Sequence, residues 1–253
     1  MNDSPARVTA CLLIIGNEIL SGRTQDANLA HIAKRLNDWA IQLREVRVIP
    51  DIEETIVDTL NACRARFDYV FTTGGIGPTH DDITADCVAK AFGLPLVHHP
   101  DAVAMLTRHY GDRINEARLR MARVPEGGSL IENPISQAPG FTVGNVFVLA
   151  GVPAIMRAQL EGVRPLVSGG VVIRSTTVSG FVGEGTIAEP LEGVQARYPD
   201  LDVGSYPFFR QGRIGTALVV RGPDEARLEA AAGEIRTILI GLGVDPITGE
   251  LPD

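Results

Sequence analysis

The chain contains 253 residues, of which 45% are hydrophobic and 21% are charged, a balance typical of a folded globular protein of one or two domains. Its formal net charge of −8 argues against nucleic acid or an anionic membrane as a partner, because both attract basic surfaces. The three cysteines form no C-x-x-C pair, and the N-terminal residues lack the pattern of a secretory signal. We therefore expect a cytoplasmic protein.

Strands and helices are predicted to alternate over the first 75 residues. The apolar run at 8–15 is typical of a strand buried on both faces, and further apolar runs occur at 41–49 and 69–73. Apolar residues at helical spacing predict one helix around Leu29 and a second beginning near Ile52. This alternation favours an α/β domain, with a mostly parallel sheet and helices on both faces.

The rest of the first domain is predicted to continue the alternation. A third helix is expected to begin near Thr79 and to end at Gly93, and a short strand follows at 94–100. Residues 100–124 have a helical and charged pattern, and turns rich in proline and glycine come next. The last two elements of this domain are a buried strand at 145–149 and a helix at 153–163.

A linker around Ser168 divides the chain into predicted domains at 1–168 and 169–253. The second domain is expected to have a βαββα order, typical of a small α+β domain. Its elements are a strand within 171–181, a helix at 184–197, strands near 202–206 and 213–221, and a helix at 223–241.

The strongest local motif is a glycine-rich run that follows the strand at 69–73. Gly74, Gly75 and Gly77 permit positive φ angles and leave backbone N–H groups uncovered for a phosphate oxygen. Ligands of open parallel sheets bind at the carboxyl ends of strands, where this run lies. The alternative is that the glycines only shape a turn. The neighbouring candidate ligand-binding residues are Thr73, Pro78, Thr79 and Asp81.

Two adjacent carboxylates, Asp81 and Asp82, complete this run. One interpretation is a capping box formed by Thr79 and Asp82, in which the carboxylates only stabilise a helix N-terminus. A phosphate on the same turn, however, would be repelled unless a divalent cation lay between it and the carboxylates. The run therefore predicts a metal-bound phosphate. The P-loop pattern is absent, and His80 stands where a dinucleotide fingerprint needs its third glycine.

A second polar segment follows the strand at 8–15. Neighbouring parallel strands would place it beside the glycine-rich run, so it is a second candidate for ligand contacts. Its alternative role is that of a polar loop that caps the next helix. Asp51 ends the strand at 41–49 on the same edge, and its alternative role is that of an N-cap. The candidate binding residues of the segment and of the helix after it are Gly16, Glu18, Ser21, Gly22 and Asn28.

Three arginines, Arg118, Arg120 and Arg123, lie close together. Arginine grips phosphate well because its guanidinium presents several donors in a fixed plane. The alternative, which we favour slightly, is a solvated helix face.

Together these motifs resemble the molybdopterin-binding domain of the MoaB/MogA type, and in particular the N-terminal region of competence/damage-inducible protein A (CinA). The chain departs from that pattern at Ser136, at Ala150 and at Arg120-Met121, where the family has glycine, proline and Lys-Gln. The matching residues are 16–22, Asn28, Asp51, 73–84, Asn115-Glu116, Pro125-Glu126-Gly127, Asn133-Pro134, Ala138-Pro139-Gly140 and Gly151-Val152-Pro153.

The resemblance implies a three-layer α/β/α domain that binds the phosphates of a nucleotide or pterin on the glycine-rich run. It also implies a divalent metal, Mg²⁺ or Co²⁺, at Asp51 and Asp82, which would be the catalytic residues. The implied activity is a metal-dependent pyrophosphatase that acts on ADP-ribose-class nucleotides. The alternatives are adenylyl transfer to molybdopterin, or a non-catalytic module that binds nucleotide or pterin.

The second domain resembles the small KH-like middle domain of CinA proteins. The deamidase domain that follows in that family lies outside these 253 residues, so deamidase activity is not expected. We expect a homo-oligomer, a dimer or trimer, whose partner is a small nucleotide or pterin.

Overall fold

The computed structural model describes residues 7–210 and 212–249. The chain divides into two compact units, Met1–Val171 and Val172–Asp253. The division falls after residue 171, whereas the sequence placed it after residue 168.

The first unit is built on a six-stranded sheet of order β2-β1-β3-β8-β7-β6. Its first four strands are parallel, and β7 and β6 are antiparallel to their neighbours. The prediction of a mostly parallel sheet is therefore confirmed. The strands are β1 (Val8–Ile15), β2 (Ile41–Ile49), β3 (Tyr69–Thr73), β6 (Ser129–Ile131), β7 (Gly140–Val143) and β8 (Val146–Leu149).

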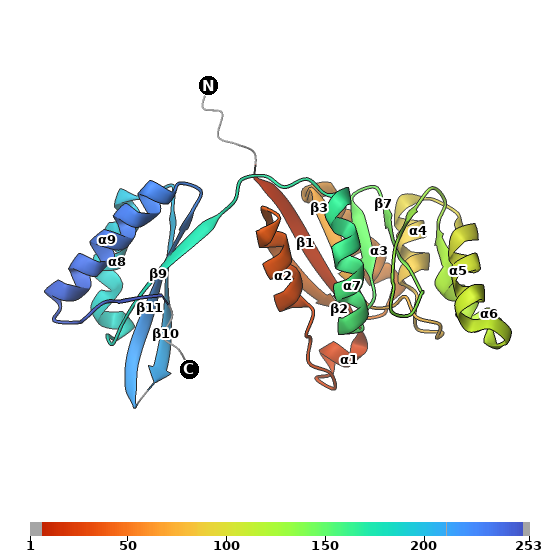
Figure 1. Cartoon of the computed structure of the whole chain (residues 1–253), viewed down its shortest axis with the longest axis horizontal. Helices are drawn as coiled ribbons and strands as arrows, with labels where there is room; N and C mark the ends of the chain where they lie inside the picture. The colour runs from red at the N-terminus through yellow and green to blue at the C-terminus, as the bar shows by residue number, and fades with distance from the viewer. Residues whose placement is uncertain (1–6, 211, 250–253) are drawn as a thin grey trace, which may run out of the picture. The chain divides into compact units, whose positions relative to one another are not determined.

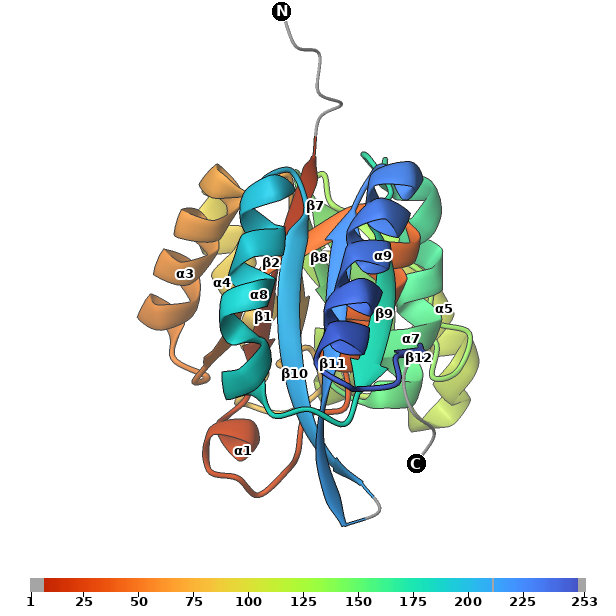
Figure 2. The same ribbon diagram turned by 90° about the vertical axis from the view of Figure 1, so that its left-hand side faces the viewer.

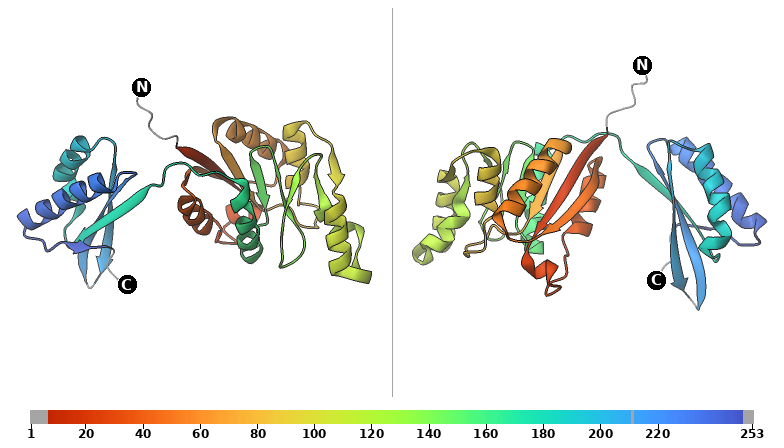
Figure 3. Two further views of the ribbon diagram at one scale, coloured as in Figure 1. Left: turned by 45° about the horizontal axis from the view of Figure 1, so that its top comes forward. Right: turned by 180° about the vertical axis from the view of Figure 1, so that it is seen from behind.

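Helices cover both faces of this sheet, as Figures 1 and 3 show. Successive side chains of a strand point to opposite faces. Leu12 of β1 accordingly packs with α2 (Leu29–Asp38) and α7 (Pro153–Val163), and Leu13 packs with α3 (Glu53–Arg66) and α4 (Thr84–Phe92). A short helix, α1 (Asn17–Leu20), follows β1. The predicted three layers are present.

Helix α4 begins at Thr84, so the prediction of a start near Thr79 is wrong. The Oδ2 atom of Asp82 accepts hydrogen bonds from the backbone N–H of Thr79, at 2.8 Å, and from its hydroxyl. The two residues thus close a turn ahead of the helix, where the sequence suggested a capping box. The helix ends at Gly93, as predicted, because this residue adopts the left-handed conformation (φ 65°) that favours glycine.

The segment between α4 and β6 leaves the main sheet, so the predicted continuation of the βα alternation is wrong there. Strand β4 (Leu96–His98) pairs only with β5 (Arg123–Pro125), in an antiparallel two-stranded sheet. The helical pattern of 100–124 is divided, because α5 (Pro100–Tyr110) ends at Gly111. After it come a 3-10 turn at Gly111–Arg113, α6 (Glu116–Leu119) and a second 3-10 turn at Arg120–Ala122.

The second unit has the predicted βαββα order, with one further short strand. Its antiparallel sheet has the order β10-β11-β9-β12. Helices α8 (Glu184–Arg197) and α9 (Glu225–Gly241) lie side by side on one face of this sheet (Figure 2), where they bury Val178, Leu218 and Ile235. The strands are β9 (Arg174–Gly180), β10 (Asp202–Arg210), β11 (Arg213–Gly222) and β12 (Ile247–Thr248).

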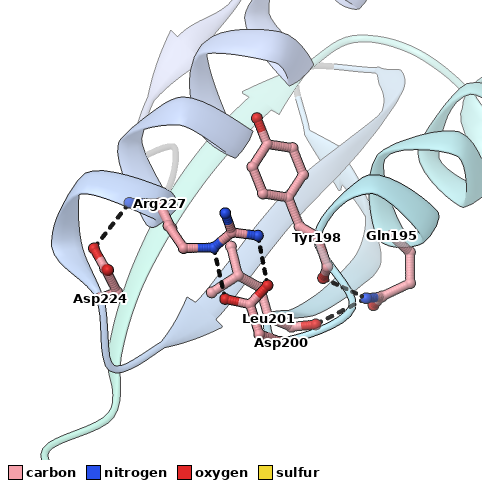
Figure 4. A network of polar contacts seen from close by, with 6 residues as sticks. All are labelled: Gln195, Tyr198, Asp200, Leu201, Asp224 and Arg227. Atoms are coloured by element: carbon pink, nitrogen blue, oxygen red, sulfur yellow. Dashed lines mark hydrogen bonds and ion pairs between the residues drawn. The ribbon is translucent and has the colours of Figure 1, made fainter.

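A polar network holds the turn after α8 against the first turn of α9 (Figure 4). Arg227 donates two hydrogen bonds to the carboxylate of Asp200, at 2.7 and 2.6 Å, and this contact lowers the pKa of Asp200. Asp224 caps α9 by accepting from the backbone N–H of Arg227 at 3.1 Å. Gln195 donates to the backbone oxygen of Leu201 at 2.8 Å. The bond from Arg227 to Asp224 satisfies one of the N–H groups that the start of α9 leaves without a partner in the helix.

Within residues 7–210 and 212–249, no helix is long and apolar enough to cross a membrane.

Candidate functional site

A pocket of about 510 Å³ lies where β1, β3 and β8 end. Because these strands are parallel neighbours, their carboxyl ends meet at one edge of the sheet. The lining comes from the segments after the three strands and from the chain between α6 and β7. Its residues are Glu18, Thr24, Gly74, Gly75, Ile76, Gly77, Pro78, Asp82, Met121, Asn133, Ser136, Ala138, Ala150, Gly151, Val152, Pro153 and Ile155.

The glycine-rich run lines this pocket, and the atoms around it explain why glycine occupies these positions. Gly74 (φ 100°) and Gly75 (φ 67°) adopt positive φ angles that other residues rarely reach. A Cβ atom at Gly74 would lie 2.1 Å from the backbone oxygen of Ile15, and one at Gly75 would lie 2.2 Å from the hydroxyl of Thr84. At Gly77 a Cβ would lie 2.6 Å from the Asp82 carboxylate. Side chains are thus excluded at Gly74 and Gly75, and a side chain at Gly77 would displace the Asp82 carboxylate.

The same run presents backbone donors that no described residue uses. Among the described residues, the N–H groups of Gly75, Ile76 and Gly77 donate no hydrogen bond. The turn itself is held from below, because the hydroxyl of Thr84 donates to the backbone oxygen of Gly74 at 3.0 Å and the N–H of Thr84 donates to that of Gly75 at 3.0 Å. Successive uncommitted N–H groups of this kind form a concavity suited to an anion.

Two carboxylates, Glu18 and Asp82, line the pocket, and no lysine, arginine or histidine does. Asp51 lies at the same edge, but it is outside the lining. Its Oδ2 accepts a 2.9 Å hydrogen bond from the backbone N–H of Asn17, so it supports the start of α1. The alternative role of Asp51 as an N-cap is wrong, because Ile52 occupies the N-cap of α3 and no side chain caps that helix.

The donor set suits a metal that is shared with a ligand. Within the described part of the chain, no group of three or more His, Cys, Asp or Glu side chains is placed to hold a metal ion. Mg²⁺, however, is commonly held by one or two carboxylates together with the phosphate oxygens of a substrate. A pocket with two carboxylates and a phosphate-sized cradle of N–H groups fits that arrangement.

Asn28 lies outside the lining and bonds to one wall of the pocket. The side chain is 4% exposed, and its Nδ2 donates a 2.8 Å hydrogen bond to the backbone oxygen of Gly151. Its Oδ1 is buried and has no partner within residues 7–210 and 212–249, and the same holds for the hydroxyl oxygens of Thr72 and Thr73 at the end of β3. Buried polar atoms without partners are uncommon in proteins, and three of them lie at this edge of the sheet.

The remaining candidates from the sequence lie in the same two segments but outside the lining. They are Gly16, Ser21, Gly22, Thr73, Thr79 and Asp81. The structure thus brings together Glu18, Gly74, Gly75, Gly77, Pro78 and Asp82 from the predicted set.

The other walls of the pocket contain none of the residues predicted from the sequence to bind a ligand. Asn133 folds one wall, because its Oδ1 accepts from the N–H groups of Ile135 and Ser136 while its Nδ2 donates to the backbone oxygen of Ala138 at 2.8 Å. Met121 and Ile155 add apolar surface. The family resemblance covered several of these loops, but apolar side chains carry no chemical motif by which sequence reasoning assigns them to a site.

Fold and pocket together define an α/β protein with a ligand pocket on a glycine-rich turn at the carboxyl edge of a mostly parallel sheet. Residues 11–168 match the family described as a probable molybdopterin binding domain, and the chain belongs to that family. Residues 173–244 match a second family model, that of the middle domain of FAD synthase.

Several known proteins are similar over most of this chain. A protein of Aeropyrum pernix is 35% identical over 96% of both chains. A CinA-like protein of Desulfosudis oleivorans is 35% identical over 88% of this chain, which spans only 57% of the length of that relative. The crystal structure of CinA from Thermoplasma acidophilum, described as a protein of unknown function, matches 63% of this chain and 99% of its own, with 36% identity and a TM-score of 0.60. The predicted CinA-like resemblance is confirmed.

Proposed function

We propose that this protein is a metal-dependent pyrophosphatase that cleaves the diphosphate of ADP-ribose-class nucleotides in the pocket on the glycine-rich turn. The observation that carries the proposal is the combination of three uncommitted N–H groups at Gly75, Ile76 and Gly77 with the carboxylate of Asp82. Phosphate oxygens need donors, and carboxylates beside a phosphate need a cation between them. The apolar walls, including Met121 and Ile155, suit a flat heterocycle.

The residues of this chain would divide the work between binding and charge stabilisation. The N–H groups of Gly75 and Gly77 would donate to the phosphoryl oxygens, on which negative charge develops during cleavage. The bond from Thr84 to Gly74 keeps these donors oriented before the ligand arrives, so no reorganisation is needed at that moment. Pocket walls that exclude water would strengthen each of these interactions.

Of the two carboxylates expected to hold a metal, Asp51 and Asp82, Asp82 is the one that lines the pocket, so we assign the divalent metal to it first. Asp51, predicted from the sequence, and Glu18, found in the lining, are the candidates for a second ligand. A bound Mg²⁺ or Co²⁺ would neutralise the diphosphate and lower the pKa of a water molecule.

A second candidate function is pterin binding with adenylyl transfer, which the description of the matched family as a molybdopterin binding domain favours. The same turn and the same pocket would then hold the phosphate and ring of a pterin. A third, a silent nucleotide- or pterin-binding module, would use the pocket without turnover.

The test is release of AMP from ADP-ribose and FAD by the purified protein, with and without Mg²⁺ or Co²⁺. We expect metal-dependent release that Asp82→Ala abolishes, while Asp51→Asn and Glu18→Gln show which residue is the second ligand. Asp58→Ala, an exposed aspartate on α3, is the matched control and should leave the activity unchanged.

Each outcome selects one function. AMP release that persists in Asp82→Ala would contradict the metal role of this residue. A folded protein that cleaves none of these substrates, yet consumes ATP when a pterin phosphate is supplied, would select adenylyl transfer. Binding without any turnover would select the module.

A further inference from the structure

Asn133 shapes one wall of the pocket, and its hydrogen bonds fix which way its amide points. Its Oδ1 accepts from the backbone N–H groups of Ile135 and Ser136, at 3.0 and 3.2 Å. Its Nδ2 donates to the backbone oxygen of Ala138 at 2.8 Å and to the hydroxyl oxygen of Ser136 at 2.6 Å. The reverse orientation would set the amide NH₂ group against two N–H donors and the amide oxygen against a carbonyl oxygen. In the bond between the two side chains, therefore, Asn133 donates and Ser136 accepts.

Ser136 retains a hydrogen-bond donor as a result. A serine hydroxyl has one hydrogen to donate and two lone pairs that accept. The bond from Asn133 occupies one lone pair, and within residues 7–210 and 212–249 the hydroxyl hydrogen of Ser136 has no acceptor. Ser136 is half-buried and lines the pocket. The same Asn133 side chain also holds the backbone of Ser136, so the hydroxyl oxygen is in place before a ligand arrives.

The other polar side chains of the lining do not offer such a donor. Glu18 and Asp82 only accept when they are ionised, and both hydrogens of the Asn133 amide are already used. The hydroxyl of Thr24 forms no hydrogen bond with the described residues, so nothing orients it. Among the lining residues, all of which the structure describes, Ser136 is thus the side-chain donor whose position is set by a hydrogen bond.

This donor belongs to a wall of the pocket and not to the glycine-rich turn. Ser136 comes from the chain between α6 and β7, which also supplies Met121, whereas the uncommitted N–H groups lie in the turn after β3. The loop before α7 adds Val152, an apolar side chain that is 56% exposed and offers a surface for a ring. A pocket of about 510 Å³ suits one small ligand, so a ligand whose phosphate lies on the turn presents its ring to these walls.

We propose that Ser136 determines specificity by donating a hydrogen bond to a ring nitrogen of an adenine base. This role rests on the proposed function, because it requires an adenine nucleotide whose phosphate lies on the glycine-rich turn. The ring nitrogens N1, N3 and N7 of adenine are acceptors that match the free donor. The family pattern has glycine at this position, so the hydroxyl is a feature of this chain. Ser136 acts in recognition and is not a catalytic residue.

The test measures, by calorimetry in the presence of Mg²⁺, the affinities for AMP and for ribose 5-phosphate, which has the phosphate but no ring. We expect Ser136→Ala to weaken AMP binding about threefold to tenfold, as the loss of one hydrogen bond predicts, and to leave ribose 5-phosphate binding unchanged. Ser136→Thr keeps the hydroxyl and should keep the affinity for AMP. Ser129→Ala, which removes an exposed hydroxyl from β6 outside the lining, is the matched control.

Analogues of AMP in which carbon replaces N1, N3 or N7 identify the accepting atom. We expect one of them to bind the unaltered protein as weakly as AMP binds Ser136→Ala. The same analogue should bind both proteins equally, because removing the donor and removing the acceptor break the same bond. Analogues that all bind as tightly as AMP would contradict the assignment to a ring nitrogen.

Equal affinities for AMP in Ser136→Ala and Ser129→Ala would overturn the proposal, and so would equal weakening of AMP and ribose 5-phosphate binding in Ser136→Ala. A lack of AMP binding by the unaltered protein would overturn it as well. A protein that recognises AMP through Ser136 but cleaves no dinucleotide would contradict the pyrophosphatase alone. The two proposals therefore fail separately.

Discussion

Asn28 and Gly151 are joined by a 2.8 Å hydrogen bond from the side-chain Nδ2 of Asn28 to the backbone oxygen of Gly151, across 123 residues of sequence. Asn28 precedes α2, and Gly151 lies in the loop between β8 and α7, where it lines the pocket. The Cβ position of Gly151 is also 3.3 Å from the Cα of Gly74. The contact thus connects the segment after β1, through one pocket wall, to the glycine-rich turn.

Asn28→Ala should lower the free energy of unfolding by about 0.5–1.5 kcal/mol, because the buried side chain of Asn28 no longer donates its hydrogen bond to the oxygen of Gly151. Chemical denaturation measures this effect. Asn37→Ala, at an exposed position of α2, should change stability by less than about 0.5 kcal/mol. Equal losses in the two variants would mean that the bond to Gly151 contributes nothing.

Gly75→Ala and Gly93→Ala form a matched pair. Both glycines have nearly the same φ, 67° and 65°, so alanine costs each a similar conformational penalty of roughly 1–2 kcal/mol. At Gly75 the new Cβ also meets the Thr84 hydroxyl at 2.2 Å, whereas nothing lies within 4 Å at Gly93. We expect only Gly75→Ala to lose phosphate binding and to destabilise further, as denaturation and ligand titration would show. Retained binding in Gly75→Ala would contradict the role of the turn.

Gln159→Leu should destabilise the protein by about 1–3 kcal/mol and weaken ligand binding. The side chain is fully buried, and its Oε1 accepts from the N–H of Ala150 at 2.8 Å while its Nε2 donates to the oxygen of Ala138 at 3.4 Å. Leucine of similar size would leave the N–H of Ala150 unpaired, whereas the oxygen of Ala138 would keep its bond from Asn133. Ala138 and Ala150 belong to two walls of the pocket. Denaturation together with ligand titration provides the measurement. A variant with unchanged stability would show that water replaces these bonds without loss.

Asp68 should make the first unit sensitive to acid. Its Oδ2 accepts from the backbone N–H and the hydroxyl of Thr9, both at 2.7 Å, and these bonds lower the pKa of Asp68 below its ordinary value of 3.8. A lowered pKa contributes stability that is complete above the ordinary value and is lost as the pH falls through the lowered value. Asp68→Asn should therefore be less stable than the unaltered protein at pH 7, and the difference should shrink below about pH 4. A difference that is constant with pH would contradict this linkage.

Much of the architecture follows from local patterns in the sequence. The helices α7 and α8 occupy the predicted residues 153–163 and 184–197, and α4 ends at Gly93 as predicted. Apolar periodicity and a glycine at a left-handed position act over a few residues, so the sequence alone determines them. The glycine-rich run was located in the same way, because a buried strand next to clustered glycines is a local motif.

Tertiary structure decided the features that depend on distant residues. Thr79 and Asp82 form a turn, so α4 begins later than predicted. Asp51 accepts a hydrogen bond from Asn17 and does not cap α3. Strand β4 pairs with β5, outside the main sheet. Met121 lines the pocket, although the sequence marked it only as a departure from the family pattern. Each of these outcomes rests on hydrogen bonds or packing between segments that only the folded chain brings together, and local spacing carries no information about such contacts.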